Sequence, residues 1–231
     1  MDKVVSILLS LNFKRIFVDN SSDCLIVHAV PGAGKTFAIQ EILRRVRGAI
    51  CLSLGPPFTT SLEALPFYRV GEPLPDCKVL IIDEYQLGFN AELKPKVCFG
   101  DPCQFNIQSL RPNFIKDTTE RFGQSTCSFL NSLGFSISSS KVDTFSIGKI
   151  FEADLCGSVL CFEKEVEDLL KSHNCEYFTP ETCLGKTFES CTAIFGHTKL
   201  LPCVRHLAFV CLTRHKSSLL LLTPDGTYTT T

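Results

Sequence analysis

The sequence predicts an α/β fold in which parallel strands form the core and helices connect them. Three features of the first hundred residues predict this fold. Apolar runs of strand length recur, a segment with helical spacing follows the first run, and turns rich in glycine or proline separate the elements. Uniformly apolar runs are typical of strands buried on both faces of a parallel sheet, and alternating strands and helices favour parallel connections.

The elements of the first half can be placed in chain order. Apolar side chains close to helical spacing predict a helix over residues 2–17. An apolar strand is expected at 24–28, and after a glycine-rich turn a helix is expected at 36–47, where Gly48 stops it. Residues 55–75 carry little regular signal. Further strands are expected at 49–54, 79–82 and 96–99.

The second half repeats the α/β pattern with weaker signals. Pro112 interrupts a polar stretch, and we place a domain boundary there. This gives an N-terminal domain of residues 1–110 and a C-terminal domain of residues 111–231. Helices are expected at 126–133 and Lys164–Ser172, and strands at 191–195, 207–212 and 219–222.

Composition limits the function classes. Hydrophobic residues make up 45% of the 231 positions and charged residues 20%, which permits a sizeable core and excludes extensive disorder. The net charge of -1 excludes a strongly cationic nucleic-acid coat or a polybasic membrane anchor, but it leaves nucleic-acid binding in a groove open. No apolar run approaches the ~20 residues of a membrane-spanning helix, and we expect no signal peptide. The 13 cysteines lack Cys-x-x-Cys spacing, which favours a reduced cytosolic protein without a zinc site or a disulfide framework.

A phosphate-binding pattern occupies residues 29–36. The stretch Ala-Val-Pro-Gly-Ala-Gly-Lys-Thr matches the Walker A pattern from Gly32 onward, with Ala29 in place of the usual first glycine. Lys35 is expected to neutralise the β- and γ-phosphates, and the Thr36 hydroxyl to ligate Mg²⁺. Backbone N–H groups at the start of the helix are expected to hold phosphate oxygens. The candidate binding residues are therefore Gly32, Ala33, Gly34, Lys35 and Thr36, and the alternative is a glycine-rich turn with an incidental Lys-Thr pair.

Acidic and amide side chains follow two later strands. Asp83 and Glu84 come directly after the most apolar run, at the strand end where ligands bind in parallel sheets. Asp83 is expected to hold the metal, and Glu84 to orient and deprotonate the attacking water. Gln104, which follows a Gly-Asp-Pro turn, is a candidate for contact with the γ-phosphate and that water. A solvated acidic loop and a plain turn are the alternatives for these two segments.

Together these three segments resemble motifs I, II and III of viral superfamily 1 helicases in their order and spacing. The second half extends the resemblance: residues 119–123 resemble motif IV, residues 183–188 motif V and residues 212–216 motif VI. Within that group, a chain this short resembles the triple gene block protein 1 family, the plant-virus movement proteins of potexviruses, carlaviruses and allexiviruses. The resemblance covers residues 24–223.

The resemblance implies a P-loop NTPase with two RecA-like parallel-sheet domains, a minimal superfamily 1 helicase core, with ATP and Mg²⁺ in the cleft between them. It implies that Arg121 and Arg214 are arginine fingers, because the charge on a transferring phosphoryl group favours a planar cation with several donors. For Arg121, a surface ion pair with Glu120 or Asp117 is the alternative. Leu184 departs from the usual glutamine of motif V, which implies weaker coupling between hydrolysis and RNA.

Two further groups of residues bear on partners. Superfamily 1 proteins stack the bases of a single strand on aromatic side chains, which suggests RNA contacts in the irregular segment that holds Phe58, Phe67, Tyr68 and Arg69. A basic cluster is better explained as the solvated end of a helix and comprises Arg44, Arg45 and Arg47.

Two histidines have structural interpretations. His28 lies in an apolar strand, which is typical of a hydrogen-bonded core residue. His215 is expected to support Arg214, its neighbour in the sequence.

The resemblance implies an ATP-binding, RNA-binding NTPase that moves viral RNA between cells and suppresses RNA silencing. The implied partners are single-stranded viral RNA, the other viral movement proteins, the coat protein and host silencing factors, with self-association and without direct membrane insertion. The implied location is the host cytoplasm, plasmodesmata or inclusions. The alternative is a non-motor interaction protein that retains the nucleotide fold and works by self-association and by binding host factors. A small-molecule P-loop kinase is disfavoured by Glu84 and by the two distal arginines.

Overall fold

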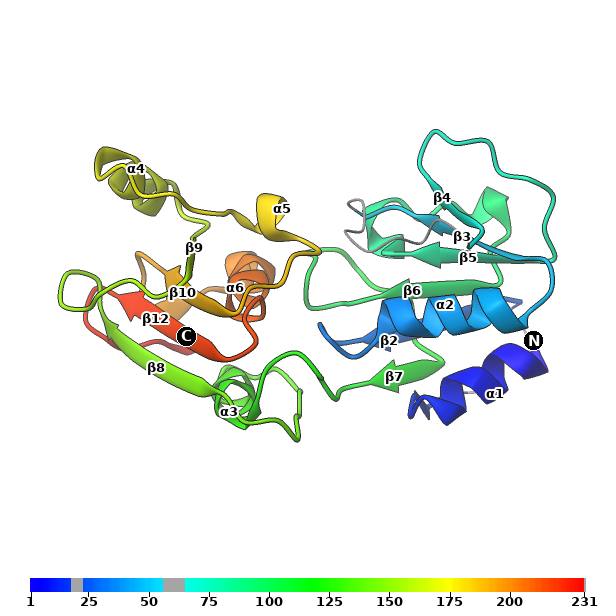
Figure 1. Ribbon diagram of the computed structural model, residues 1–231, viewed down its shortest axis with the longest axis horizontal. Helices are drawn as coiled ribbons and strands as arrows, with labels where there is room; N and C mark the ends of the chain where they lie inside the picture. The colour runs from blue at the N-terminus through cyan, green and yellow to red at the C-terminus, as the bar shows by residue number, and fades with distance from the viewer. Residues whose placement is uncertain (18–22, 56–64, 231) are drawn as a thin grey trace. The chain divides into compact units, whose positions relative to one another are not determined.

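A seven-stranded β-sheet dominates the first part of the chain in the computed structural model, which describes residues 1–17, 23–55 and 65–230 (Figure 1). Its strand order is β1-β7-β2-β6-β5-β3-β4, and all neighbouring strands are parallel except β1 and β7. The strands are β1 (Lys14–Arg15), β2 (Leu25–Ala29), β3 (Ala49–Ser53), β4 (Phe67–Arg69), β5 (Val79–Asp83), β6 (Val97–Gly100) and β7 (Phe114–Lys116). The predicted parallel α/β fold is confirmed.

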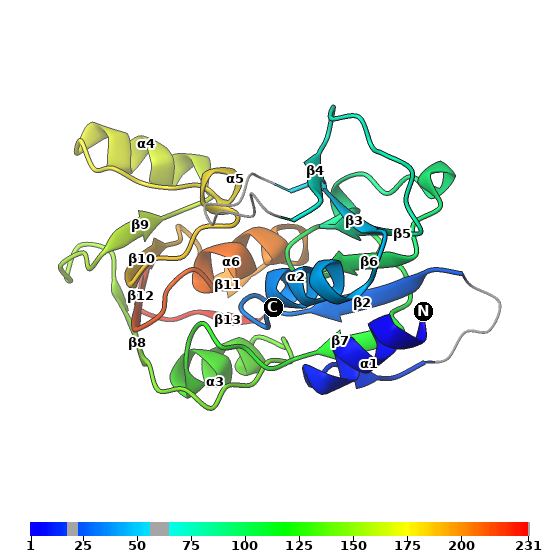
Figure 2. The ribbon, with the colours of Figure 1, turned by 45° about the vertical axis from the view of Figure 1, so that its right-hand side comes forward.

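Two helices, α1 (Asp2–Ser10) and α2 (Lys35–Arg45), cover one face of this sheet. They lie side by side in both ribbon views (Figures 1 and 2). The apolar core between helices and sheet includes Leu8, Ile39, Ile42, Ile81 and Phe99, all fully buried. The opposite face carries a smaller cluster that includes Ile50, Leu80 and Ile82, together with Tyr85 from the short 3₁₀ helix η1 (Tyr85–Leu87). A second 3₁₀ helix, η2 (Ala91–Leu93), follows.

Two predictions for the first half differ from the structure in detail. The first helix ends at Ser10 rather than near residue 17, because Asn12 takes a left-handed conformation with φ of 62° and the chain then enters β1. A short strand, β4, lies within the segment 55–75 that carries little regular signal. Residues 56–64 of that segment, which include Phe58, lie outside the described residues.

The second part of the chain forms a four-stranded sheet in which every neighbouring pair is parallel. Its order is β8 (Thr144–Lys149), β12 (Ser218–Thr223), β10 (Ser190–Ile194) and β9 (Ser158–Leu160). One face packs against α4 (Lys164–Ser172) through Val166, Leu170, Ile194 and Leu222. The remaining elements are α3 (Gln124–Ser132), α5 (Pro180–Cys183), η3 (Pro202–Val204), α6 (Arg205–Leu212), and the strand pair β11 (Lys199–Leu200) and β13 (Thr229–Thr230).

Residues 207–212, predicted as a strand, are helical and form most of α6. This prediction was wrong because all five residues from Ala208 to Leu212 are buried. A helix that is apolar on every side shows no periodicity, so its sequence looks like that of a buried strand. The guanidinium of Arg205, the first residue of the helix, donates to the carbonyl of Leu133 at 2.7 Å and lies over the ring of Phe135.

The chain separates into two compact units that differ slightly from the predicted domains of 1–110 and 111–231. The first unit comprises Met1–Pro102 and Ile107–Asp117, and the second comprises Cys103–Asn106 and Thr118–Thr231. The first unit extends past residue 110 because β7 pairs with β1 and β2. No helix among the described residues is long and apolar enough to cross a membrane.

Candidate nucleotide site

The three predicted site segments of the first half leave neighbouring strands at the same edge of the seven-stranded sheet. Strands β2, β6 and β5 are adjacent and parallel, so their carboxyl ends meet. The glycine-rich turn follows β2, Asp83 ends β5, and Gly100 ends β6. Ligands of open parallel sheets bind outside this edge.

The glycine-rich turn has the backbone that a phosphate loop needs. Gly32 has φ of 76° and Gly34 has φ of 90°, both in the left-handed region that favours glycine. Gly34 is the residue before α2, and no side chain caps that helix. The first N–H groups of a helix lack intrahelical partners, and together with the helix dipole they favour an anion. The turn therefore fits a phosphate group at the start of α2.

Lys35, the first residue of α2, folds back over the turn. Its Nζ atom donates a hydrogen bond of 3.0 Å to the carbonyl oxygen of Ala29, at the end of β2. The ammonium group has three donors, and this bond uses one of them. The bond holds the side chain across the loop rather than pointing into solvent, which is the orientation required for contact with a phosphate in the turn.

Asp83 lies at the end of β5 and is 2% exposed. Burial and then the charge of Glu84 raise its pKa, the charge of Lys35 and the N–H of Glu84 lower it, and the net result is a pKa of about 7. A buried carboxylate beside a second one is a site where a cation relieves electrostatic strain.

Glu84 has an unusual backbone for its residue type. Its φ is 52° and its ψ is 46°, in the left-handed region, and its N–H donates to Oδ1 of Asp83 at 3.1 Å. A non-glycine residue in this region stores strain, and such residues cluster at functional sites. Asp83 is buried, whereas Glu84 is half-buried and its side chain lies beside Gly55, where an added Cβ atom would lie 3.1 Å from Cγ of Glu84.

The donors present fit a nucleotide with a divalent cation. Thr36 and Asp83 supply a hydroxyl and a carboxylate, the oxygen ligands that Mg²⁺ prefers, and the phosphates would supply others. The turn from Gly32 to Lys35 supplies N–H donors and a cation for the phosphates. Both sets belong to the first unit.

Gln104, the third predicted element, is placed differently. It is buried, with 7% exposed, and it belongs to Cys103–Asn106, which packs with the second unit. Asp101, three residues earlier, is fully buried in the first unit. A role for Gln104 beside the γ-phosphate stays a prediction.

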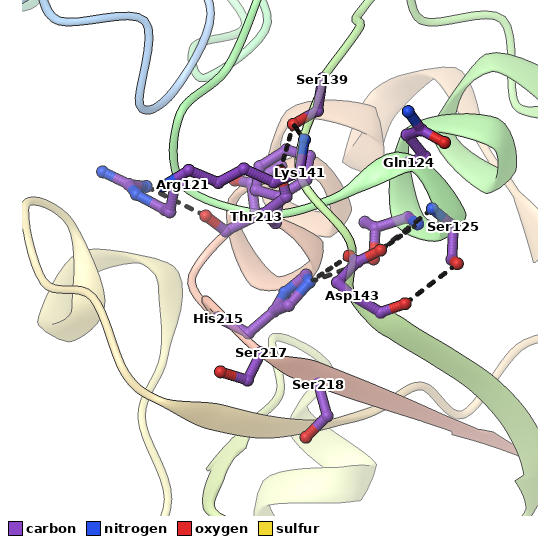
Figure 3. A network of polar contacts seen from close by, with 12 residues as sticks. Arg121, Gln124, Ser125, Ser139, Lys141, Asp143, Thr213, His215, Ser217 and Ser218 are labelled. Atoms are coloured by element: carbon purple, nitrogen blue, oxygen red, sulfur yellow. Dashed lines mark hydrogen bonds and ion pairs between the residues drawn. The ribbon is translucent and has the colours of Figure 1, made fainter.

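The two predicted arginine fingers both bond to one residue of the second unit, Thr213, and Figure 3 shows the bond from Arg121. Nη1 of Arg121 donates to the carbonyl oxygen of Thr213 at 3.0 Å, and Nη2 of Arg214 donates to its hydroxyl at 3.2 Å. Nε of Arg214 also donates to the carbonyl of Val210 near the end of α6. Arg121 is half-buried, whereas Arg214 is only 2% exposed. Asp117, considered as an ion-pair partner of Arg121, pairs with Lys14 at 3.1 Å.

A buried polar network beside these arginines contains residues that the sequence did not single out. Nε2 of His215 lies 3.0 Å from the hydroxyl of Thr126 and 3.2 Å from Oδ2 of Asp143. Oδ1 of Asp143 accepts the backbone N–H of Ser125 at 3.0 Å, at the start of α3 (Figure 3). The His215 ring also stacks on Phe122, the residue after Arg121, with 5.4 Å between ring centroids. The network therefore joins the loop that carries Arg121 to the segment that carries Arg214.

The residues considered for RNA contact have mixed surroundings. Phe67 and Tyr68 are half-buried in the edge strand β4, and Arg69 is exposed. In the basic cluster, Arg44 and Arg45 form ion pairs with Glu41 on the same helix. These pairs support the interpretation of the cluster as a solvated helix end.

Comparison with known proteins identifies sequence relatives over the whole chain. Residues 25–223 match the model of the viral superfamily 1 RNA helicase core domain. The chain is 36% identical to "Movement and silencing protein TGBp1" of Chrysanthemum virus B, over 100% of both chains. It is 36% identical to the protein of the same name from Poplar mosaic virus and 34% identical to that from Lily symptomless virus, each over 99% of both chains.

Solved structures with the same fold are larger helicases. The arterivirus nonstructural protein 10 helicase, solved with DNA, matches with a TM-score of 0.64 at 16% identity, covering 86% of this chain and 60% of that one. The PRRSV helicase matches with a TM-score of 0.61 at 20% identity, covering 97% of this chain and 54% of that one. The chain thus spans a little more than half the length of these helicases, and at this identity the likeness concerns the fold.

Proposed function

The chain belongs to the viral superfamily 1 RNA helicase family and, within it, to the TGBp1 movement and silencing proteins, and from this membership we propose that it is a Mg²⁺-dependent ATPase whose hydrolysis is linked to single-stranded RNA. Family membership makes it a helicase-like movement protein of the NTPase kind. The proposal adds the nucleotide, the metal, the residues that act and the nucleic acid.

One observation carries the proposal: the phosphate turn of Gly32–Lys35 follows β2, the carboxylates of Asp83 and Glu84 follow β5, and these parallel strands, which flank β6, end at the same edge of one sheet. Bound ATP brings a transferable γ-phosphoryl group, and Mg²⁺ neutralises its developing charge. The turn's N–H groups and Lys35 would bind the phosphates, and Thr36 and Asp83 would hold the metal. Glu84 would orient a water and take its proton.

The second unit supplies the remaining cations of the proposal. Arg121 and Arg214 would stabilise charge on the transferring phosphoryl group, and Gln104 would help to position the water. A planar guanidinium suits this role because it offers several fixed donors to phosphate oxygens. These three assignments rest on the family motifs at positions 104, 121 and 214.

The wider role follows the names of the relatives. We extend to this chain the movement of viral RNA between cells and the suppression of RNA silencing. The partners are then single-stranded viral RNA, other viral movement proteins, the coat protein, host silencing factors and further copies of the chain. The host cytoplasm, plasmodesmata and inclusions are the places where this role would be carried out.

ATP hydrolysis by the purified protein tests the biochemical core of the proposal. Turnover is measured with Mg²⁺ or with EDTA, with and without single-stranded RNA, for the parent, Lys35→Ala, Glu84→Gln and the exposed control Lys3→Ala. We expect Mg²⁺-dependent turnover that RNA stimulates, that Lys3→Ala retains and that both site variants lose. ATP binding without turnover in the parent contradicts the motor function and favours a non-motor interaction protein that uses nucleotide as a structural ligand.

Movement and silencing assays in plants separate the same two functions. Lys35→Ala should abolish cell-to-cell movement if hydrolysis drives transport. Movement that survives Lys35→Ala contradicts a role for the ATPase in transport. Silencing suppression that survives the substitution assigns that activity to binding surfaces rather than to turnover.

A further inference from the structure

Directly after the two site carboxylates, the chain places a buried aromatic residue. Tyr85 is 2% exposed, although it begins a short 3₁₀ helix at the end of a strand, where exposed residues are common. Its ring packs in the second core cluster of the first unit with Ile82 and Cys98. The residue next to the proposed general base is therefore anchored in the core.

The Tyr85 hydroxyl joins three segments of the first unit. It lies 2.8 Å from Nε2 of His28, which belongs to β2 just before the phosphate turn. It also accepts the backbone N–H of Leu110 at 3.0 Å, in the segment that follows the third motif. The rings of Tyr85 and His28 are stacked, with 5.9 Å between centroids and 8° between planes.

The partner of this hydroxyl is a neutral histidine. His28 is 7% exposed, and burial together with the charge of Lys35 lowers its pKa to about 4. The hydroxyl oxygen accepts from Leu110, so its own proton is available to the neutral imidazole nitrogen. Such a buried bond between neutral groups is strong in a low-dielectric interior, and loss of either partner leaves the other unsatisfied.

The next residue fixes the other end of the same turn. Gln86 is 5% exposed, and a Cβ atom at Gly100 would lie 2.1 Å from its Oε1 atom. Gly100 is opposite His28 in the register of β2 and β6. The turn after Glu84 is thus held against the ends of both strands that flank the site.

We propose that Tyr85 and His28 are positioning residues for Glu84: their buried hydrogen bond ties the turn that carries the general base to the strand that carries the phosphate loop. Glu84 needs such support because its left-handed backbone persists only where neighbouring contacts determine it. This inference rests on the proposed ATPase function and names two further residues that determine its rate.

Single-residue changes that keep both rings test the role of the hydrogen bond. Tyr85→Phe and His28→Phe each remove it and keep an aromatic ring at the position. We expect the kcat for ATP to fall about tenfold in each variant, since a misplaced base slows the chemical step. The Kd for a non-hydrolysable ATP analogue should stay within about twofold of the parent, because the phosphate turn is unchanged. Tyr177→Phe, which removes a hydroxyl bonded to Glu167 at 3.0 Å in the second unit, is the matched control and should leave both values unchanged.

The double variant separates this role from a general loss of stability. Both changes remove the shared bond, and Tyr85→Phe also removes the acceptor of the Leu110 N–H, so Tyr85→Phe/His28→Phe should lower kcat no further than Tyr85→Phe alone, about tenfold and not a hundredfold. Parental kcat in Tyr85→Phe overturns the inference, and so does a variant that is unfolded at the assay temperature or that loses analogue binding together with turnover. A parent without Lys35-dependent turnover instead overturns the proposed function, and the inference with it.

Discussion

Nε2 of His215 lies 3.2 Å from Oδ2 of Asp143, and both side chains are inaccessible to solvent. The two residues are 72 positions apart, yet each belongs to a segment that matters for the site. Asp143 accepts the N–H groups of Ser125 and Thr126 at the start of α3, directly after the motif IV residues 119–123, and His215 follows Arg214 directly. The pair therefore connects the segment that carries Arg121 to the segment that carries Arg214.

This pair predicts an acid-dependent contribution to folding. Burial raises the pKa of Asp143, but hydrogen bonds from His215, Thr126 and backbone N–H groups outweigh it and lower the pKa to about 2. The folded pKa lies below the unfolded value near 3.9, so the stabilisation is present above that value and is lost as the pH falls toward about 2. The free energy of unfolding of the parent, relative to Asp143→Asn, should fall by about 1 kcal/mol between about pH 5 and about pH 3. Urea unfolding of both proteins at each pH measures this difference, and a constant difference contradicts it.

Asp83 predicts the opposite pH dependence in the metal-free protein. Its folded pKa of about 7 lies above the unfolded value, so the folded state holds the extra proton and loses stability as the pH rises through about 7. Asp83→Asn removes this loss. In EDTA, its unfolding free energy relative to the parent should rise by about 1 kcal/mol between about pH 6 and about pH 8. The exposed control Asp154→Asn should show no such rise. If the unfolding free energy of Asp83→Asn relative to the parent does not change with pH, the raised pKa of Asp83 is contradicted.

The same substitution separates stability from function. Asp83→Asn should be more stable than the parent at about pH 8 and should lose Mg²⁺-dependent turnover, because the carboxylate is retained for the metal at the expense of folding. With an ATP analogue present, adding Mg²⁺ should raise the Tm of the parent further and leave that of the variant unchanged. A variant that is both stabilised and fully active contradicts the assignment of Asp83 as a metal ligand.

The sequence predicted the strands and the turn around the candidate nucleotide site because each of these elements is encoded by a short continuous segment, while the roles of the site residues stay predictions. The turn, Lys35 and the first strand form one segment of about a dozen residues, and the strand before Asp83 is the most apolar run. Helix α4 was also predicted with its observed bounds, since its apolar residues recur on one face. Local spacing is sufficient for such elements.

Other features depend on contacts that the sequence does not encode locally. Strand β8 was not predicted, because it is an edge strand whose residues are mostly exposed and polar. His28 was expected to be a hydrogen-bonded core residue, which is confirmed, but its partner Tyr85 lies 57 positions away. Asp143 lies in none of the motifs and Thr126 lies just after motif IV, and only the folded chain brings them to His215.

Substitution of the two arginines should reduce turnover in both cases but lower the free energy of unfolding by different amounts. Arg214 is buried and bonds to Val210 and Thr213, so Arg214→Gln should lower the free energy of unfolding by about 3 kcal/mol as well as abolish turnover. Arg121 is half-buried with a bond to the Thr213 carbonyl, so Arg121→Gln should cost about 1 kcal/mol while turnover falls about a hundredfold. Urea unfolding and ATP turnover of both variants, beside the surface control Arg44→Gln, measure this contrast. Equal losses of stability would mean that burial does not separate the two roles.

Gly123, the glycine of motif IV, lies so close to neighbouring backbone atoms that no side chain fits at this position. Gly123 has φ of -103°, which every residue type can adopt, so its backbone conformation does not require glycine. A Cβ atom there would instead lie 2.3 Å from the backbone nitrogen of Asp143 and 2.5 Å from the carbonyl carbon of Val142. Backbone atoms held by the Asp143 network cannot move aside as the end of a flexible side chain can.

Gly123→Ala should therefore lower the free energy of unfolding by about 3 kcal/mol or more, since overpacking against backbone forces the two segments apart. Gly148→Ala in β8 is the matched control, because its nearest neighbour would be a methyl carbon of Leu222 at 3.4 Å. That change should alter stability by less than about 1 kcal/mol. Turnover should fall with stability in Gly123→Ala, as separation of the motif IV loop from Asp143 also displaces Arg121. If Gly123→Ala and Gly148→Ala are equally stable, the loop of residues 119–123 can move away from Asp143 freely. That result would contradict the connection of the two arginine segments through this network.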